Sequence, residues 1–147
     1  MAADLERVRL LLDVTHLAVV AAPRPDGTVH ASLVSAGILD DPISGEPSIA
    51  IVVAGAARKL DHFRRTGQAT AVVTHGYRWA SVEGPVRIIG PDDTSGGGPP
   101  EGVPSLLRRV FVAAGGTHDD WDGYDRVMAE QRRAAVFIHA ARTAGNG

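Results

Sequence analysis

Residues 48–89 have the sequence SIAIVVAGAARKLDHFRRTGQATAVVTHGYRWASVEGPVRII, and this stretch decides the fold class. Residues 48–53 form a short apolar run typical of a buried strand, and residues 56–65 have the composition of a helix that ends at a glycine. Two further strands follow directly, at 68–74 and 78–89, joined by the turn residues between them. Because the helix leads into a hairpin and not into a single parallel strand, the stretch predicts an antiparallel sheet.

Toward the N-terminus the sequence predicts another hairpin. Residues 17–22 are typical of a short buried strand, and residues 28–38 of its return strand. The turn RPDG at 24–27 supports the pairing, because proline presets φ and the Asp-Gly pair accepts positive φ. Before the hairpin, residues 4–13 place apolar side chains on one stripe of a helix, with Asp4 favourable at its start.

Toward the C-terminus the sequence predicts two helices and a last strand, at 104–113, 122–132 and 134–140. Residues 91–100, rich in glycine and proline, cannot continue a helix or strand and are expected to form a mobile surface loop. Residues 143–147 are expected to be a frayed end.

The order of these elements is helix, hairpin, strand, helix, hairpin, two helices and strand. It is not the alternation of strands and helices that builds a parallel sheet. It predicts a fold that is mainly β with α additions, in which an antiparallel sheet closes into a barrel with helices at its ends and edges. Because no repeat and no long linker divides the chain, residues 1–147 are expected to form a single domain.

The composition excludes several classes of protein. The 147 residues are 44% hydrophobic and 22% charged, which is typical of a globular chain. A formal net charge of -2 gives no reason to expect nucleic acid or a membrane as a partner, and no apolar run is long enough to span a bilayer. The chain has no cysteine, so no disulfide, thiolate nucleophile or cysteine metal site is expected, and this is neutral on compartment. Because the first residues lack the pattern of an export signal, the cytoplasm is the expected location.

No motif of a nucleophilic, nucleotide-hydrolysing or metal-dependent enzyme is present. The sequence lacks a Gly-x-Ser-x-Gly elbow, a Walker lysine loop and a His-Glu-x-x-His pair. Its six histidines show no ligand spacing, so no metal site is expected. If the chain is an enzyme, a bound cofactor is expected to supply the chemistry.

Arg58 and Lys59 are the first candidates for a binding site, and Lys59 is the only lysine in the chain. Both fall in the first turn of a predicted helix, where free N–H groups and the helix dipole favour an anion such as a phosphate. The alternative is that they form a solvated basic face of the helix.

Aromatic and polar residues elsewhere have structural explanations. Packing against a ligand ring and packing against neighbouring strands explain Trp79 equally well. His118, Asp119 and Trp121 lie between two predicted helices, where capping and hydrophobic stapling explain them better than acid–base catalysis. Gly84 indicates a bulge or a close approach of strands.

Three stretches together resemble a known family. They are residues 57–65 (ARKLDHFRR), residues 77–84 (YRWASVEG) and residues 115–124 (GGTHDDWDGY), the last followed by Met128 and Arg132-Arg133. In that order and at these separations they resemble the F420-dependent branch of the pyridoxamine 5′-phosphate oxidase-like family, which is common in actinobacteria. The resemblance runs from about residue 5 to about residue 142.

This resemblance implies a split β-barrel homodimer with two equivalent deazaflavin sites at the subunit interface. In such proteins the phosphate of F420 meets basic residues where a strand leads into a helix. Ala57 departs from the pattern, because many relatives carry a basic or hydroxyl residue at that position. The implied cofactor-binding residues are Lys59 and Arg58 near the phosphate, Ser32 and Ser35 of the second strand, Val52 and Val53 of the third, and Trp79 contributed across the interface.

The implied activity is that of an F420-dependent oxidoreductase, which transfers a hydride between F420 and a small organic acceptor. The alternatives are an FMN-dependent oxidoreductase of the same class and a flavin- or F420-binding protein without turnover. The expected partners are a small-molecule substrate and a second copy of the chain. No residue is assigned as catalytic, and Ser35 is the polar side chain considered for protonating the product.

Overall fold

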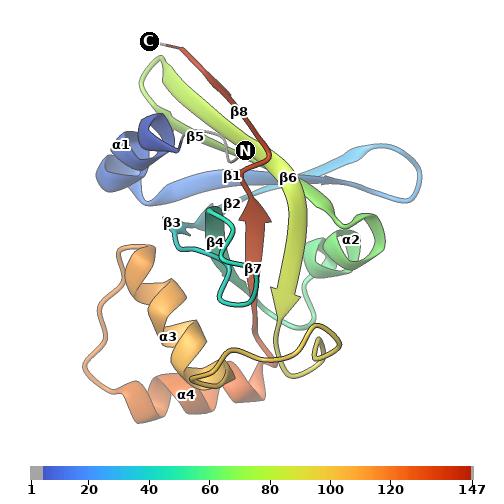
Figure 1. The fold of residues 1–147 in the computed structure, drawn as a ribbon, viewed down its shortest axis with the longest axis vertical. Helices are drawn as coiled ribbons and strands as arrows, with labels where there is room; N and C mark the ends of the chain where they lie inside the picture. Colours follow the sequence, from blue (N-terminus) through green and yellow to red (C-terminus); the bar gives the residue numbers. More distant parts are fainter. Residues whose placement is uncertain (1–4, 147) are drawn as a thin grey trace.

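The computed structural model describes residues 5–146, which form a curled antiparallel sheet with four helices around it (Figure 1). The helices are α1 (Glu6–Thr15), α2 (Arg58–Thr66), α3 (Val103–Ala113) and α4 (Trp121–Glu130). The strands are β1 (Leu17–Pro23), β2 (Val29–Ser35), β3 (Gly37–Ile38), β4 (Ser48–Val53), β5 (Gln68–His75), β6 (Arg78–Ile89), β7 (Ala134–His139) and β8 (Arg142–Gly145). No described helix is both long and apolar enough to cross a membrane.

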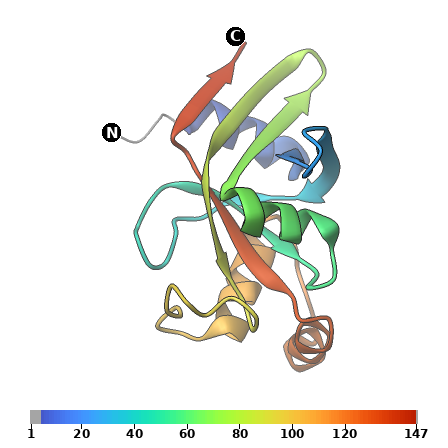
Figure 2. The ribbon, with the colours of Figure 1, turned by 90° about the vertical axis from the view of Figure 1, so that its right-hand side faces the viewer.

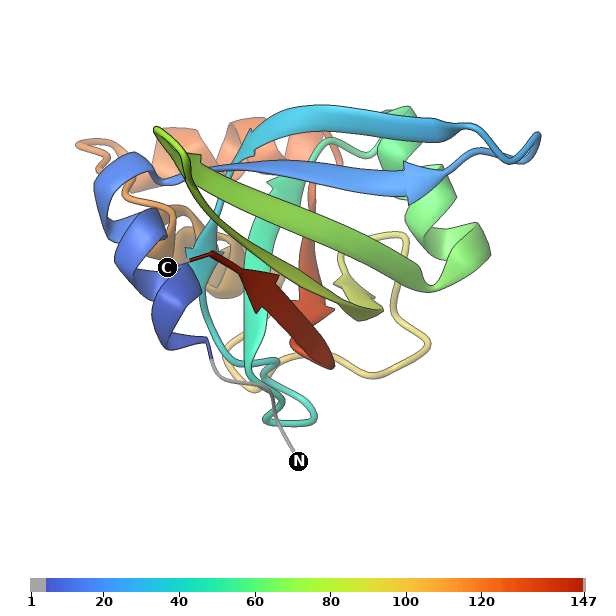
Figure 3. The same cartoon turned by 90° about the horizontal axis from the view of Figure 1, so that it is seen from above.

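The strand order confirms the predicted fold class. The strands follow the order β2-β1-β5-β6-β7-β4-β3, with β8 paired to β6, and every pairing is antiparallel. Helices α1 and α2 lie at opposite ends of the β1–β5 part of the sheet (Figure 3). Helices α3 and α4 lie together at the end of the molecule away from α1 (Figure 2). The fold is therefore mainly β with α additions, as the element order predicts.

The long strand β6 joins the two halves of the sheet. Its first part pairs with β5 as far as Pro85, and from Val86 onward it pairs with β7. The change of partner falls beside Gly84, where an added Cβ would lie 2.2 Å from the carbonyl oxygen of His139. The predicted close approach of strands at Gly84 is confirmed, because only a residue without a side chain fits against that carbonyl.

Two hydrophobic clusters lie on either side of β4 and β7. One fills the barrel and includes Ile51, Phe63 and Val136, while the other lies under α3 and α4 and includes Leu106 and Phe137. Because both strands are covered on both faces, their sequences are continuous apolar runs and do not alternate.

The segment expected to be one return strand, residues 28–38, is divided into β2 and β3. At the break, the Ala36 N–H donates to the carbonyl oxygen of His16 at 2.9 Å. The next residue, Gly37, passes so close to α3 that an added Cβ would lie 2.2 Å from the Ala113 carbonyl oxygen. Contacts distant in sequence therefore interrupt the strand. Helix α1 begins at Glu6, and Asp4, expected at its start, lies outside the described residues.

The expectation of a frayed end at 143–147 is wrong for the part of it that the structure describes. Residues 142–145 form β8, which pairs with β6, and Arg142 bonds Glu83 at 2.9 Å. The Asn146 side chain accepts from the Trp79 N–H at 2.8 Å and donates to the Tyr77 carbonyl oxygen at 2.7 Å. The tail is ordered because β6 offers it a free edge. Gly147 lies outside the described residues.

Mobility of the loop at 91–100 stays a prediction, but the loop is not free of contacts. Asp92 and Asp93 form ion pairs with Arg132 and Arg64, and Pro99 is buried. Only the glycine-rich middle is exposed throughout.

Deletion of residues 95–98 is therefore expected to change the free energy of unfolding by no more than about 0.5 kcal/mol, the usual size of a surface change. A thermal melt of the shortened chain against the parent measures this. A larger loss would mean that the middle of the loop packs against the protein.

Candidate functional site

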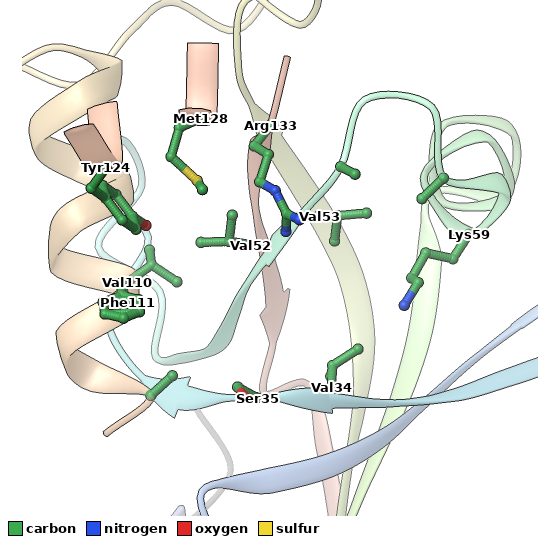
Figure 4. Close-up of a pocket in the computed structure, with 13 residues that line it drawn as sticks. Val34, Ser35, Val52, Val53, Lys59, Val110, Phe111, Tyr124, Met128 and Arg133 are labelled. Atoms are coloured by element: carbon green, nitrogen blue, oxygen red, sulfur yellow. The ribbon is translucent and has the colours of Figure 1, made fainter. Parts of the chain in front are cut away.

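A pocket of about 470 Å³ lies between β2, β4, the start of α2 and the helix pair α3–α4 (Figure 4). Strand residues Val34, Val52 and Val53 form one apolar side of it. The aromatic and thioether side chains of Phe111, Tyr124 and Met128 line it from the helix pair, and the other contributors are Ser35, Ala54, Ala57, Lys59, Val110, Ala114 and Arg133. Its volume and its mainly apolar lining are those of a small-molecule site.

Two cations from different segments of the chain face this pocket. Lys59 extends from the first turn of α2 and Arg133 from the residues just before β7, and Figure 4 shows both side chains directed toward the space between them. Burial lowers the pKa of Lys59, and the positive charge of Arg133 lowers it further. Within the described part of the chain, no Asp or Glu lines the pocket. An anion bound in the pocket would interact favourably with both cations.

Helix α2 adds to this positive potential. Its N-cap residue, Ala57, is extended and makes no side-chain hydrogen bond to the free N–H groups of the first turn. The dipole of α2 therefore acts in the same direction as the Lys59 ammonium group.

Seven of the fourteen arginines have a carboxylate partner among the described residues, whereas the pocket cations do not. Lys59, Arg133 and Arg58 take part in none of the salt bridges formed among the described residues, and the only side-chain bond of Arg133 found there is to the Gln131 amide oxygen at 2.7 Å. The paired arginines include Arg64, Arg87, Arg108 and Arg132. Lys59 and Arg133 therefore bring positive charge to the pocket lining that no carboxylate of the described residues balances.

Further basic groups continue from the pocket along β2 and α2. The rings of His30 and His62 meet edge to face with centroids 5.2 Å apart. The pKa of His30 is lowered first by desolvation and then by the charges of Arg24, His62, Lys59 and Arg58. The positive region therefore extends beyond the pocket and reaches the hairpin between β1 and β2.

The wall formed by α3 and α4 is held together by aromatic packing. The Tyr124 ring lies 5.0 Å from Phe111 and 5.3 Å from Trp121, measured between centroids. Its hydroxyl donates to the Leu107 carbonyl oxygen at 3.1 Å, and burial raises its pKa. Because this hydroxyl is already bonded to the backbone, Tyr124 contributes a ring face to the pocket and not an acid.

The segment before α4 has the predicted structural role, but the capping residue is Asp120 and not His118 or Asp119. The Asp120 carboxylate accepts from the Gly123 N–H at 3.0 Å and so caps the helix. His118 accepts from the Asp120 N–H at 3.0 Å, and its ring lies 5.7 Å from that of Trp121. These residues position the pocket wall.

The structure brings four of the seven predicted site residues to the pocket, namely Lys59, Ser35, Val52 and Val53. Ser32, Arg58 and Trp79 do not line it within the single chain. Ser32 is two residues before Val34 on the same side of β2, and its hydroxyl oxygen is buried with no hydrogen-bond partner among the described residues. Arg58 is exposed beside the pocket, and Trp79 is 38% exposed on β6.

Several pocket residues were not predicted from the sequence. Arg133, Met128 and Tyr124 belong to the third stretch of the family resemblance and its continuation, but no role was assigned to them. Phe111 gave no signal, since an aromatic residue in a helix is usually core. The residue pair Arg132-Arg133 was the one available indication of a second cation.

Comparisons with known proteins give the fold. No protein-family model matches the sequence, and no curated protein matches it. A conserved hypothetical protein from Mycobacterium tuberculosis is similar in structure, with a TM-score of 0.68, 21% identity, and coverage of 98% of this chain and 85% of that chain. An F420 reductase matches with a TM-score of 0.62 and 17% identity over 92% of this chain and 94% of its own.

A protein from Listeria innocua assigned as a pyridoxamine 5′-phosphate oxidase matches with a TM-score of 0.57 and 11% identity, covering 95% of both chains. At these identities the likeness concerns the fold alone. Together with the curled antiparallel sheet and its helices, the matches show that this chain has the split β-barrel fold of pyridoxamine 5′-phosphate oxidase-like proteins.

Proposed function

We propose that the protein is an oxidoreductase that binds coenzyme F420 in the pocket between β4, α2 and α3–α4 and transfers a hydride to or from a small organic acceptor. The observation that carries the proposal is the pairing of Lys59 and Arg133 in an apolar pocket without a carboxylate. A flat ring system with a phosphate-bearing side chain fits this pocket, because the ring can pack against the apolar walls and the phosphate can bind the two cations.

The residues present fit such a cofactor. Lys59 and Arg133 would bind its phosphate, assisted by the N–H groups at the start of α2. Val34, Val52 and Met128 would pack against the ring system and keep water from its faces. The unpartnered hydroxyl of Ser32 and the hydroxyl of Ser35 are the polar groups available to its ring edge.

A bound deazaflavin supplies hydride transfer, a chemistry for which the protein needs no nucleophile or metal. The task of the chain is to fix the ring, hold the phosphate and admit the acceptor beside it. The bonded Tyr124 hydroxyl is not a proton donor, so Ser35 stays the candidate for protonating the product.

The extended positive region favours F420 over FMN in this proposal. FMN ends at its phosphate, whereas the side chain of F420 continues beyond it with carboxylate groups. Arg24 and Arg58 provide positive charge beyond the pocket cations. An FMN-dependent oxidoreductase and a binding protein without turnover are the other functions that the test below distinguishes.

The test is a fluorescence titration of the purified protein with F420, FMN and riboflavin, followed by hydride-transfer assays with whichever ligand binds. F420 should bind more tightly than FMN, and FMN more tightly than riboflavin, because each step removes anionic groups. Preference for FMN would identify the FMN enzyme, and binding without turnover of any acceptor would identify a carrier. Equal affinity for FMN and riboflavin would eliminate a phosphate site at Lys59 and Arg133.

The homodimer is also a proposal, and the outer face of the sheet supports it. On β1, β2 and β5 apolar side chains face outward, and Val19 is the cross-strand neighbour of both Leu33 and Val72. Leu33 is 64% exposed and Val29 61%. A patch of this kind is typical of a protein interface, and a second copy of the chain is the proposed occupant.

Leu33→Asp is expected to weaken dimerisation about thirtyfold or more, because a carboxylate would be buried against an apolar partner surface. Sedimentation at micromolar concentration should show a dimer for the parent and a monomer for the variant. Leu10→Asp, at a residue 61% exposed on α1, is the matched control and should remain dimeric. A parent that is monomeric would contradict a shared interface.

A further inference from the structure

A tight turn after β6 carries two adjacent carboxylates that bind one arginine of α2 and one of the turn between α4 and β7. The turn closes with a hydrogen bond from the Asp93 N–H to the Gly90 carbonyl oxygen at 3.1 Å. Asp93 accepts from Arg64 through Nε at 2.9 Å and Nη2 at 2.7 Å. Asp92 accepts from Arg132 through Nε at 2.9 Å and also through Nη2. Both contacts are two-point ion pairs, which fix the orientation of the guanidinium group.

Each of these arginines is tied to one of the pocket cations. Arg64 is in the last turn of α2, and Lys59 is in the first turn of that same helix. Arg132 immediately precedes Arg133 in the sequence. A single turn therefore holds both the helix that carries Lys59 and the backbone that carries Arg133.

The two cation-bearing segments also touch each other directly. The Gly55 N–H, in the loop between β4 and α2, donates to the Gln131 carbonyl oxygen at 3.0 Å. A Cβ on Gly55 would lie 2.7 Å from the Arg132 carbonyl oxygen, so the two backbones are as close as a glycine allows. Arg132 itself has a φ of 48°, a left-handed conformation uncommon outside glycine. The Asp92 contact holds the side chain of this unusual residue.

These contacts matter for the pocket because its two cations have charges of the same sign. Lys59 and Arg133 repel each other, and no carboxylate of the described residues stands between them. Without an anion bound, the lowest-energy response of an unsupported site would be for the two cations to move apart.

We propose that Asp92 and Asp93 are positioning residues of the anion site. By binding Arg132 and Arg64 from one turn, they hold in place the two segments from which Arg133 and Lys59 reach the pocket. We call this pair the aspartate clamp. The inference rests on the proposed function, since it gives the clamp a role in phosphate binding.

A purely electrostatic effect of Asp92 and Asp93 on phosphate affinity would be opposite to a positioning effect. The direction in which the affinity changes therefore tests the clamp. Neutralising two carboxylates near a positive site strengthens its attraction for an anion. If Asp92 and Asp93 act only through their charge, the variant Asp92→Asn/Asp93→Asn binds a phosphate ligand more tightly. If they position the cations, it binds more weakly.

The experiment is a titration of parent and double variant with FMN and with riboflavin, which lacks the phosphate, beside thermal melts. We expect FMN affinity to fall roughly three- to tenfold, a size typical of two partly exposed ion pairs. Riboflavin affinity should not change, because the ring surfaces do not depend on the clamp. The matched control is Asp61→Asn, which removes a carboxylate 3.3 Å from Arg64 but within α2 itself, and it should not weaken FMN binding.

The possible results separate the two proposals. Unchanged or tighter FMN binding by the double variant, or equal losses for FMN and riboflavin, would overturn the clamp while leaving the phosphate site intact. A parent that binds FMN and riboflavin equally would overturn the proposed function, and the clamp with it. A selective loss of FMN affinity in the double variant and not in Asp61→Asn supports the clamp.

Discussion

Replacing Asp41 by alanine is expected to lower the free energy of unfolding by about 3–5 kcal/mol, the usual cost of breaking a buried ionic network. The Asp41 side chain has no exposed surface. It accepts from the N–H groups of Ile43 at 2.8 Å and Ser44 at 3.2 Å, from Arg87 Nε at 2.5 Å, and it bonds His139 Nε2 at 2.8 Å. Alanine would leave two backbone donors and a guanidinium group without their partner.

The same carboxylate gives the stability a defined dependence on pH. Burial alone would raise the pKa of Asp41, but the bonds from Ile43, His139, Arg87 and Ser44 outweigh it and lower the pKa to about 2. Because this value is below that of the unfolded chain, about 3.9, the contribution is present above about pH 4 and is lost as pH falls toward 2. It is of the order of 2–3 kcal/mol.

Urea unfolding at neutral pH and at about pH 3 measures both effects. The parent should lose stability between these conditions, and Asp41→Ala should lose less because its contribution is already gone. Asp119→Ala, at an exposed position, is the control and should follow the parent. An Asp41→Ala variant as stable as the parent at neutral pH would show that the network is not needed for the fold.

This network also shows what the sequence cannot indicate. Its side-chain members are 46 and 98 residues apart along the chain, Asp41 to Arg87 and Asp41 to His139. Nothing in the local pattern around any of the three indicates a shared site. By contrast, the strands at 48–53 and 78–89 and the helix near Lys59 were predicted closely, because apolar periodicity and glycine stops are local properties.

The prediction for the segment that forms β8 was wrong for a related reason. Its sequence, Arg142 to Gly145, is short and weakly apolar, so its own propensity predicts no strand. It forms one because the first half of β6 presents a free edge and Asn146 bonds the backbone there. Conformation at such a segment is decided by its partner.

The residues of the candidate site also differ in whether a local sequence pattern indicates them. Lys59, Val52 and Val53 were predicted because they sit where a strand leads into a helix, and that junction is visible in the sequence. Arg133 was missed because it reaches the pocket through the turn after α4, whose position depends on the packing of α3 and α4. The second half of an anion site can therefore come from a segment with no local signature.

We expect the same result from substituting either pocket cation, Lys59 or Arg133. Lys59→Ala and Arg133→Ala should each weaken F420 and FMN binding by about 1.5–3 kcal/mol, roughly tenfold to a hundredfold, because each removes a charge-assisted bond to phosphate. Neither should lower the free energy of unfolding by more than about 0.5 kcal/mol. Neither cation forms an ion pair with a carboxylate of the described residues, so the folded state loses little.

Fluorescence titration with F420, FMN and riboflavin, beside thermal melts, separates these effects. Riboflavin binding should be unchanged in both variants, because the lost bond is to the phosphate. Arg58→Ala is the neighbouring control: Arg58 is exposed beside the pocket, so its loss should weaken F420 more than FMN and by less than the loss of Lys59. If Lys59→Ala and Arg133→Ala bind every ligand as the parent does, the phosphate lies elsewhere. If Arg58→Ala alone weakens binding, the first turn of α2 holds the anion outside the pocket, and the ring must then be sought along β2.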